Sequence, residues 1–552
     1  MNIPNSVERG EMQTIPNLHP SQRSPSRATD TTTIAANGLY YDNATSPTDT
    51  PLSESFSDRL GSFVGSFSRT SLMYMAENVT VSNPSDSLMD TNDDQVSIIS
   101  SYNPRSRRNS LGTLHDERTS LLGYQPIDKV YTGQSHISTI ADTYQDDTST
   151  HNIHHKKSNF LQSVFNSINI LAGVGILALP LGFKYAGWIL GFVLFFFCLG
   201  LTNYTAKLLG RCLYAYPESQ TYGDMAYNAF GNRGRILVSI LFLTELVTCA
   251  VALVVLLSDG LDSLFFPGEH PLSMRVASFF ILTPMLFFPV RHLSYTSLIG
   301  IMSALSIIIV LVADGFTKTT SPGSLIEPAD TTYWPEDWMA LPRSTGIIMS
   351  GCAGHACLAT IYRDMQKPKQ YTRMVDWTYI ITALIYLTVA VTGYRMFGSK
   401  TMQEITQNLV LIPEYNQMFN RMAVWLIALN PIAKYGLTLN PVNLSWELAL
   451  ARQPSVYIWC NKQPWRGKVI SLVGKVTVSA LVVLLAYAIP EFDRIMSLLG
   501  ACFSFIVSGL FPILCYLKLF GHTLSSWEKL ILYILFFLCF VLALVGTIWS
   551  FI

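Results

Sequence analysis

Charged residues are scarce in this chain of 552 residues, at 13%, and acidic and basic side chains balance to a formal net charge of zero. A chain without surplus positive charge lacks the attraction that dominates nucleic-acid binding, so no nucleic-acid partner is expected. It also lacks the Gly-x-x-x-x-Gly-Lys run of a phosphate-binding loop and any cluster of residues with metal-ligand spacing. We therefore expect no enzyme, no cofactor and no metal.

Long apolar runs are missing from the first 157 residues, which are rich in Ser, Thr, Asn, Asp and Pro. Such a segment cannot bury enough surface to offset the chain entropy lost on folding, so it is predicted to be a disordered tail. Its first 30 residues are polar and do not resemble a cleavable signal peptide. The nine cysteines all lie at or after Cys198, within or beside apolar segments, so no disulfide framework is expected.

Residues 158–552 show the opposite composition, with repeated apolar runs near the roughly 20 residues that a membrane-spanning helix needs. Hydropathy predicts an all-α membrane domain embedded in the lipid bilayer with eleven spans. The predicted spans are 160–183, 186–210, 236–258, 274–290, 293–314, 343–361, 376–397, 418–440, 468–489, 494–518 and 527–550.

Loop charge predicts the orientation of these spans. Lys and Arg favour the loops after even-numbered spans by about two to one, and Lys156 and Lys157 stand directly before the first span. Because positive loops stay on the cytosolic side, the N-terminus is predicted to be cytosolic and the C-terminus to lie across the membrane.

Glycines interrupt two spans at corresponding positions of the two halves. The first run is 166–180, Asn-Ser-Ile-Asn-Ile-Leu-Ala-Gly-Val-Gly-Ile-Leu-Ala-Leu-Pro, and the second is 346–357, Gly-Ile-Ile-Met-Ser-Gly-Cys-Ala-Gly-His-Ala-Cys. Unwound backbone at membrane depth is tolerated only where protein buries it or a cavity contains it. Spans one to five and six to ten then form a five-plus-five inverted repeat with one additional helix, and the repeat interface is the expected binding site.

The run 165–188, from Phe165 to Trp188, closely resembles the first helix of the amino acid/auxin permease family. Within that family it is most similar to fungal vacuolar amino acid transporters, relatives of the vesicular GABA transporter. The pair Gly354-His355 and the run 430–441 match as well, and the resemblance covers about residues 158 to 552. It implies a leucine-transporter-like fold and proton-coupled exchange of amino acids into an acidic vacuole.

Backbone at the two breaks suits a free amino acid. Half-helix N-termini attract the carboxylate, and unwound carbonyls attract the ammonium. The alternative is close helix packing by small residues, with Pro180 as a simple kink. The predicted substrate site comprises Asn169, Gly173, Val174, Gly175, Ser350, Gly351, Cys352 and Ala353.

Three ionisable residues are candidates for proton coupling or gating. Glu245 stands in the middle of the third span, where a charge costs about 2.5–3.5 kcal/mol and usually marks function. The alternative is a static ion pair with Lys434 of the eighth span, which is either a fixed counter-charge or a residue that snorkels to water. His355, beside the second break, either carries protons or serves as a hydrogen-bonded structural residue.

The N-terminal tail carries short patterns typical of sorting signals and phosphorylation sites. An acidic dileucine pattern and a tyrosine pattern adjoin one another, which predicts binding of cytosolic sorting adaptors. The alternative is that these short patterns arise by chance in a disordered segment and have no function. Ser110 follows two arginines and is a candidate phosphorylation site. The residues of the sorting patterns are Glu117, Leu121, Leu122, Tyr124 and Ile127.

These features together predict an amino acid transporter of the vacuolar membrane, most simply a proton antiporter that moves amino acids from cytosol to lumen. Two alternatives remain open. One is a cation-coupled importer at the plasma membrane, and the other is a receptor that binds amino acids and signals without net transport.

Overall fold

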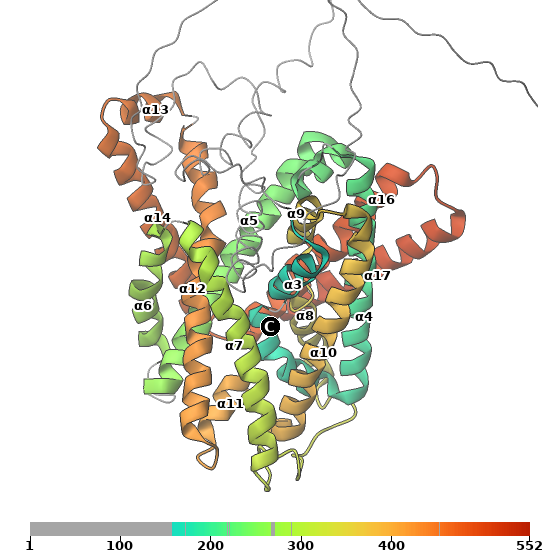
Figure 1. Cartoon of the computed structure of the whole chain (residues 1–552), viewed down its shortest axis with the longest axis vertical. Coiled ribbons are helices and arrows are strands. Elements are labelled where there is room, and N and C mark those ends of the chain that lie inside the picture. The colour runs from blue at the N-terminus through green and yellow to red at the C-terminus, as the bar shows by residue number, and fades with distance from the viewer. Residues whose placement is uncertain are drawn as a thin grey trace, which may run out of the picture. The chain divides into compact units, whose positions relative to one another are not determined.

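The computed structural model describes residues 157–171, 173–217, 219, 221–265, 271–288, 290–451 and 453–552 (Figure 1). The described residues fold into helices and contain no β-strand, apart from an isolated bridge between Ser158 and Met365. In chain order the main helices are α3 (Phe160–Leu171), η4 (Val174–Ala178), α4 (Leu179–Ala215), α5 (Tyr222–Phe265), α6 (Pro271–Leu282), η5 (Thr283–Phe287), α7 (Val290–Thr317), α8 (Leu341–Ser350), α9 (His355–Asp364), α10 (Tyr371–Phe397), α11 (Ile405–Leu411), α12 (Gln417–Ala451), α13 (Pro454–Asn461), α14 (Pro464–Ala488), α15 (Phe492–Leu498), the π-helix η9 (Leu499–Leu510), α16 (Phe511–Phe520) and α17 (Ser526–Trp549). Three short 3-10 turns flank these helices: η6 (Trp338–Ala340) precedes α8, η7 (Pro368–Gln370) precedes α10, and η8 (Gly398–Lys400) follows α10.

The predicted helical membrane domain is confirmed. Within the described ranges, 8 helices are long and apolar enough to cross a membrane, and two shorter apolar helices cover Ser273–Phe287 and Met302–Thr317. Each of the eleven predicted spans falls on these helices, the first of them on α3, η4 and the start of α4. The fourth span is split between α6 and η5.

Two glycines with positive φ interrupt the long helical ranges. Two helical segments meet at Gly187 within α4, where φ is 69°, close to the predicted gap between the first two spans. A Cβ there would lie 2.7 Å from the Trp334 carbonyl carbon, so only glycine allows this close contact with residues 332–334. Within α5, Gly231, whose φ is 67°, separates a short helical segment that starts at Tyr222 from the apolar helix that follows, so the third span begins a few residues before the predicted 236.

The helices pack as two groups that support the repeat. Helices α3, α4, α8, α9 and α10 contact one another and contain the first, second, sixth and seventh spans. Helices α5, α6, α12 and α14 form the other group and contain the third, fourth, eighth and ninth spans. Figure 1 shows the groups on the right and left of the view, with α7 between them. Each group thus pairs helices from equal positions of the two halves, as a five-plus-five repeat requires.

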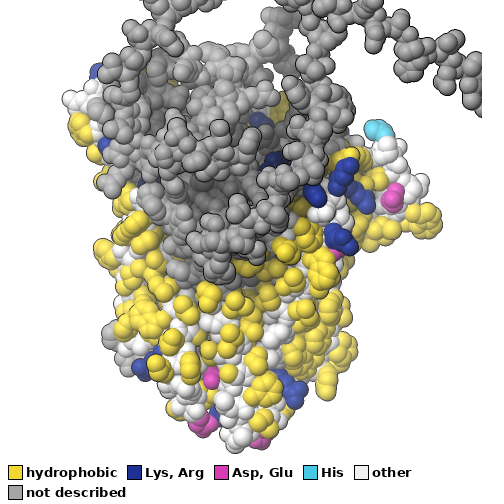
Figure 2. All heavy atoms as spheres, in the orientation of Figure 1, with side chains coloured by type: hydrophobic (Ala, Val, Ile, Leu, Met, Phe, Trp, Pro, Cys, Tyr) yellow, Lys and Arg dark blue, Asp and Glu magenta, His cyan; other side chains and the backbone are white. Residues whose placement is uncertain are grey.

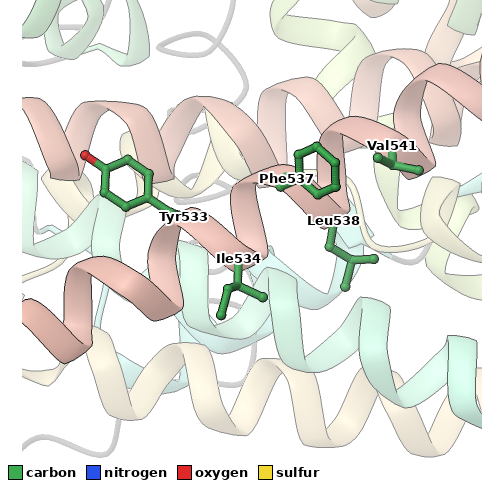
Figure 3. Close-up of a pocket in the computed structure, with 5 residues that line it drawn as sticks. All are labelled: Tyr533, Ile534, Phe537, Leu538 and Val541. Carbon is green, nitrogen blue, oxygen red and sulfur yellow. The ribbon is translucent and has the colours of Figure 1, made fainter.

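Apolar side chains cover the middle of the face seen in Figure 2, whereas Lys, Arg, Asp and Glu gather toward its ends. The outward face of α17 belongs to this belt, and five of its residues line a shallow apolar depression (Figure 3). Phe537 is 68% exposed there, which suits contact with lipid. The depression offers nothing to orient a zwitterion, so it is not the substrate site. The lining residues are Tyr533, Ile534, Phe537, Leu538 and Val541.

Candidate functional site

The two predicted helix breaks are present. The α-helix α3 ends at Leu171, and the chain resumes as the 3-10 helix η4 after Gly173, which has extended backbone. The second helix stops at Ser350 and restarts at His355. Gly354 caps the restart with a φ of 148°, which favours glycine because it has no Cβ. Both helices are therefore interrupted within membrane-spanning segments, as the glycine clusters predicted.

The breaks also lie against each other. A Cβ on Gly175 would stand 3.2 Å from Ser350 Oγ and 3.3 Å from the backbone of Gly351, so the two segments touch through glycine. Close packing by small residues does occur here, as the alternative supposed, but it joins interrupted helices. Two C-terminal half-helix ends and two N-terminal ones consequently meet in one region. Such ends carry partial charges of opposite sign, and a zwitterion matches that pattern.

The predicted substrate residues cluster around this meeting point. Asn169 is buried near the end of α3, and Val174, Gly175, Gly351 and Cys352 are buried as well. Gly173 and Ala353 are half-buried. The side chain of Ser350 is engaged locally, since its hydroxyl donates to the Ile347 carbonyl at 2.7 Å. At Ser350, the backbone groups and not the hydroxyl are therefore the ones available to bind a substrate.

Tyr386 of α10 is the residue at this site that the sequence did not single out. It is fully buried, and its hydroxyl donates to the carbonyl of Gly351 at 2.8 Å and also to that of Leu171. The Gly351 carbonyl, predicted to face the ammonium, thus already has a donor. No sequence signal separates Tyr386 from the other tyrosines, because it stands in an ordinary apolar span.

His355 opens α9 and is fully buried. Its Nε2 lies 2.9 Å from Thr205 Oγ1, and the same hydroxyl lies 2.6 Å from the Ser508 carbonyl. A threonine that donates to Ser508 and accepts from the Nε2–H satisfies both contacts. The histidine is therefore hydrogen-bonded to α4, as its structural alternative supposed, while its Nδ1 finds no hydrogen-bond partner in the part of the chain that the structure describes.

Glu245 lies in α5 with a half-buried side chain, and its buried Oε2 has no hydrogen-bond partner among the described residues. Lys434 does not pair with it, since no ion pair links the two in the described ranges. Instead Lys434 packs on α7, where a Cβ at Gly300 would lie 3.2 Å from Lys434 Cε. The described ranges therefore give no support to the static-pair alternative, and the role of Glu245 in proton coupling stays a prediction.

Residues 401–411, which we call the far-side cap, tie several helices together. Lys184 of α4 donates to the Thr401 carbonyl at 3.0 Å, and the Phe492 amide at the start of α15 donates to the Gln403 side chain at 2.9 Å. The next residue, Asp493, accepts from Tyr185 at 3.2 Å and pairs with Arg343 at 3.5 Å. These contacts link α4, α8 and α15 to one another and to the far-side cap.

Glu404 of the far-side cap is 1% exposed, and within the described ranges its Oε1 has no hydrogen-bond partner. Burial, reinforced by Asp259 nearby, raises the pKa of this carboxyl well above its ordinary value, against a weaker opposing hydrogen bond from Thr406. The folded protein thus holds a proton that the unfolded chain would release. The stability contributed by this site is complete below the ordinary pKa of about 4.3 and is lost as pH rises through the folded-state pKa.

Glu404→Gln, which is neutral at every pH, is therefore expected to flatten the pH dependence of thermal stability. Between about pH 5 and pH 8 the wild type should lose a few degrees more in Tm than this variant, since about 1 kcal/mol shifts Tm by roughly 2–4 °C. Thermal unfolding of the purified protein measures this. Glu414→Gln is the control, because Glu414 lies in the same loop region but is 61% exposed and paired with Lys318. Parallel profiles for wild type and Glu404→Gln would contradict the assignment.

The chain directly before α3 is bound on the opposite side. The Ser158 amide donates to the Asp364 carbonyl at 2.8 Å, the Gln366 amide donates to the Ser158 carbonyl at 2.9 Å, and the Ser158 hydroxyl donates to the Asp364 carboxylate. These bonds fasten the start of the first helix to the end of the sixth. The predicted sorting residues Glu117, Leu121, Leu122, Tyr124 and Ile127 and the candidate phosphosite Ser110 lie outside the described residues.

Comparison with known proteins gives one consistent family. A family model described as transmembrane amino acid transporter protein matches residues 156–552. Amino acid transporter AVT1B of Arabidopsis thaliana is 32% identical over 402 residues, covering 71% of this chain and 70% of the relative. Amino acid transporter AVT1C of the same plant is 33% identical over 406 residues, covering 72% of this chain and 68% of the relative.

Solved structures with similar helix arrangements are more distant. MhsT in complex with L-phenylalanine aligns with a TM-score of 0.44 at 12% identity, over 70% of this chain and 98% of that chain. A Na+-coupled sialic acid symporter aligns with a TM-score of 0.43 at 13% identity, over 70% of this chain and 87% of that chain.

Proposed function

Because this chain belongs to the transmembrane amino acid transporter family, we propose that it is a proton/amino acid antiporter of the vacuolar membrane. In this proposal it moves amino acids from the cytosol into the lumen. The observation that carries the proposal is the contact between two interrupted helices at Gly175 and Gly351. Opposed half-helix ends at one point offer an amino acid a place for each of its two charges.

Substrate recognition in this proposal is made mainly by backbone. The carboxylate takes the N–H groups at the start of η4, around Gly173, Val174 and Gly175, and the ammonium takes carbonyls near Asn169 and Cys352. All free amino acids carry both of these charges, so this part of the site is expected to bind amino acids with different side chains.

Glu245 is the proposed proton carrier. It is an intramembrane acid with an unpartnered buried oxygen and no ion pair to Lys434 in the described part of the chain. An unpaired carboxyl in a membrane is costly to keep charged, so gain and loss of a proton is the change it can make most readily. Such a step, linked to helix movement, couples a proton gradient to substrate exchange.

The energetics of the exchange suffice for storage. One pH unit is worth about 1.4 kcal/mol, and one charge moved through about 100 mV is worth about 2.3 kcal/mol. Exchange of one proton for a neutral zwitterion therefore supplies roughly 3.7 kcal/mol, which sustains a gradient of several hundredfold. The vacuolar location rests on the family resemblance and on the dileucine and tyrosine patterns of the tail, and the direction rests on the resemblance.

The test is uptake of labelled amino acids into isolated vacuoles that are acidified by their own ATP-driven pump. Vacuoles with the wild-type protein should accumulate a subset of amino acids, and collapse of the proton gradient should stop accumulation. Glu245→Gln should reduce accumulation to the level without a gradient, while exchange of labelled for unlabelled amino acid continues, because a neutral side chain still permits alternating access.

Glu327→Gln is the matched control, since Glu327 is exposed in the loop before α8. Accumulation that survives Glu245→Gln would remove this residue from the coupling mechanism. Uptake that is unchanged by deletion of the whole protein, for every amino acid, would contradict the proposed function itself.

A further inference from the structure

The hydroxyl of Tyr386 occupies an unusual position between the two helix breaks. It donates to the Gly351 carbonyl at 2.8 Å and to the Leu171 carbonyl, and Tyr386 is fully buried. Its ring packs directly on the second break, because a Cβ on Gly351 would lie 2.9 Å from Tyr386 Cε2. One side chain of α10 thus touches the ends of both half-helices.

The two acceptors share an electrostatic character. Leu171 is the last residue of α3, and Gly351 directly follows the last residue of α8. Carbonyls at these positions lack the donor that a continuing helix would supply and stand at the negative end of the helix dipole, and that of Leu171 accepts also from the Gly173 amide at 2.6 Å. Two such ends that converge in a membrane attract a small cation, and unwound carbonyls at half-helix C-termini can coordinate sodium.

A hydroxyl group offers one proton, yet two carbonyls converge on it here. The titratable groups that interact with Tyr386 are Cys352 of the second break and Tyr379 of α10, which are uncharged in their ordinary forms. The donor that faces the partial negative charge of the two helix ends is therefore the neutral Tyr386 hydroxyl.

We propose that the Tyr386 hydroxyl takes the place of a monovalent cation between the two half-helix ends, so that the breaks are held together without sodium. This inference rests on the proposed transport function, since it identifies what keeps the substrate site assembled through the cycle. Tyr386 is a positioning residue, because it acts on the carbonyls and not on the substrate. Removal of its oxygen exposes both carbonyls to any small cation that can enter.

Tyr386→Phe tests the proposal, because it removes the hydroxyl and keeps the ring against Gly351. The purified variant should gain about 3 °C or more in Tm when choline chloride is replaced by sodium or lithium chloride, since a ligand that binds only the folded state stabilises it. Wild type should show no such difference. In proteoliposomes, amino acid exchange by Tyr386→Phe should fall at least about tenfold in choline and recover in part in sodium.

Tyr394→Phe is the matched control. Tyr394 is also buried in α10 and hydrogen-bonded, but its hydroxyl accepts from the Thr332 amide at 2.9 Å, away from the breaks. This variant should lose some stability without any response to sodium. If Tyr386→Phe does not fold, Tyr386→Asn, which offers an amide oxygen to a cation, serves for the same comparison.

Two results would overturn the proposal. A Tyr386→Phe protein that is destabilised equally in sodium and choline would show that the hydroxyl is a structural bridge that water can replace. A wild-type protein that itself requires sodium for stability or exchange would show that a cation is still needed. If wild type transports no amino acid in any salt, the proposed function fails, whereas the thermal comparison still decides whether the hydroxyl replaces a cation.

Discussion

Gly500→Ala is expected to abolish amino acid transport and to destabilise the protein, because no side chain fits where η9 crosses α8. A Cβ on Gly500 would lie 1.7 Å from the Gly346 carbonyl oxygen and 2.6 Å from the Ser350 amide nitrogen. Both are backbone atoms of the helix that ends at the second break, so neither can rotate away. Overpacking of a core typically costs about 1–3 kcal/mol and sometimes more, and here it also displaces the substrate site.

Expression level, thermal unfolding and uptake measured together would test this expectation. Gly200→Ala is the control, because no atom lies within 4 Å of a Cβ at that position and alanine favours the helix. The control should match wild type in uptake and equal or exceed it in stability. Wild-type transport by Gly500→Ala would mean that α8 and η9 do not cross as closely as described.

The helix breaks could be predicted because their signal is local. Glycine clusters and Pro180 weaken a helix wherever they stand, and their recurrence in both halves indicated a pair. Hydropathy likewise predicted the spans, since each must match the thickness of the lipid. The break at Gly187 falls within four residues of the predicted gap between the first two spans, whereas its close contact with Trp334, far away in the sequence, had no local signal.

Contacts between distant segments left no comparable signal. In the sequence Tyr386 looks like any other aromatic residue of an apolar span. Only the structure shows that its hydroxyl lies against the ends of α3 and α8. The pairing of Glu245 with Lys434 seemed reasonable from charge alone, yet the Lys434 side chain packs against Gly300 of α7. Side-chain direction within a bundle depends on all neighbouring helices, and a single sequence does not encode it in any one place.

Asp493→Asn is expected to slow transport about tenfold, because Asp493 joins three helices above the breaks. Its side chain is 3% exposed, accepts from Tyr185 of α4 and pairs with Arg343 of α8. In the proposed transport cycle, the two sides of the membrane domain open to the substrate in turn. These bonds then break as the far side opens and form again as it closes. Loss of the charge weakens closure and leaves Arg343 without its counter-charge.

A double-mutant cycle isolates this contact from general damage. Arg343→Gln and Asp493→Asn should each slow exchange, and the double variant should be little slower than either, with a coupling of about 1–3 kcal/mol. The Arg494–Glu491 pair in the same region is the control, because its side chains are 32% and 40% exposed and i,i+3 neighbours. Additive effects for Arg343 and Asp493 would mean that the two groups act separately, and the far side would then owe its closure to the 401–411 cap alone.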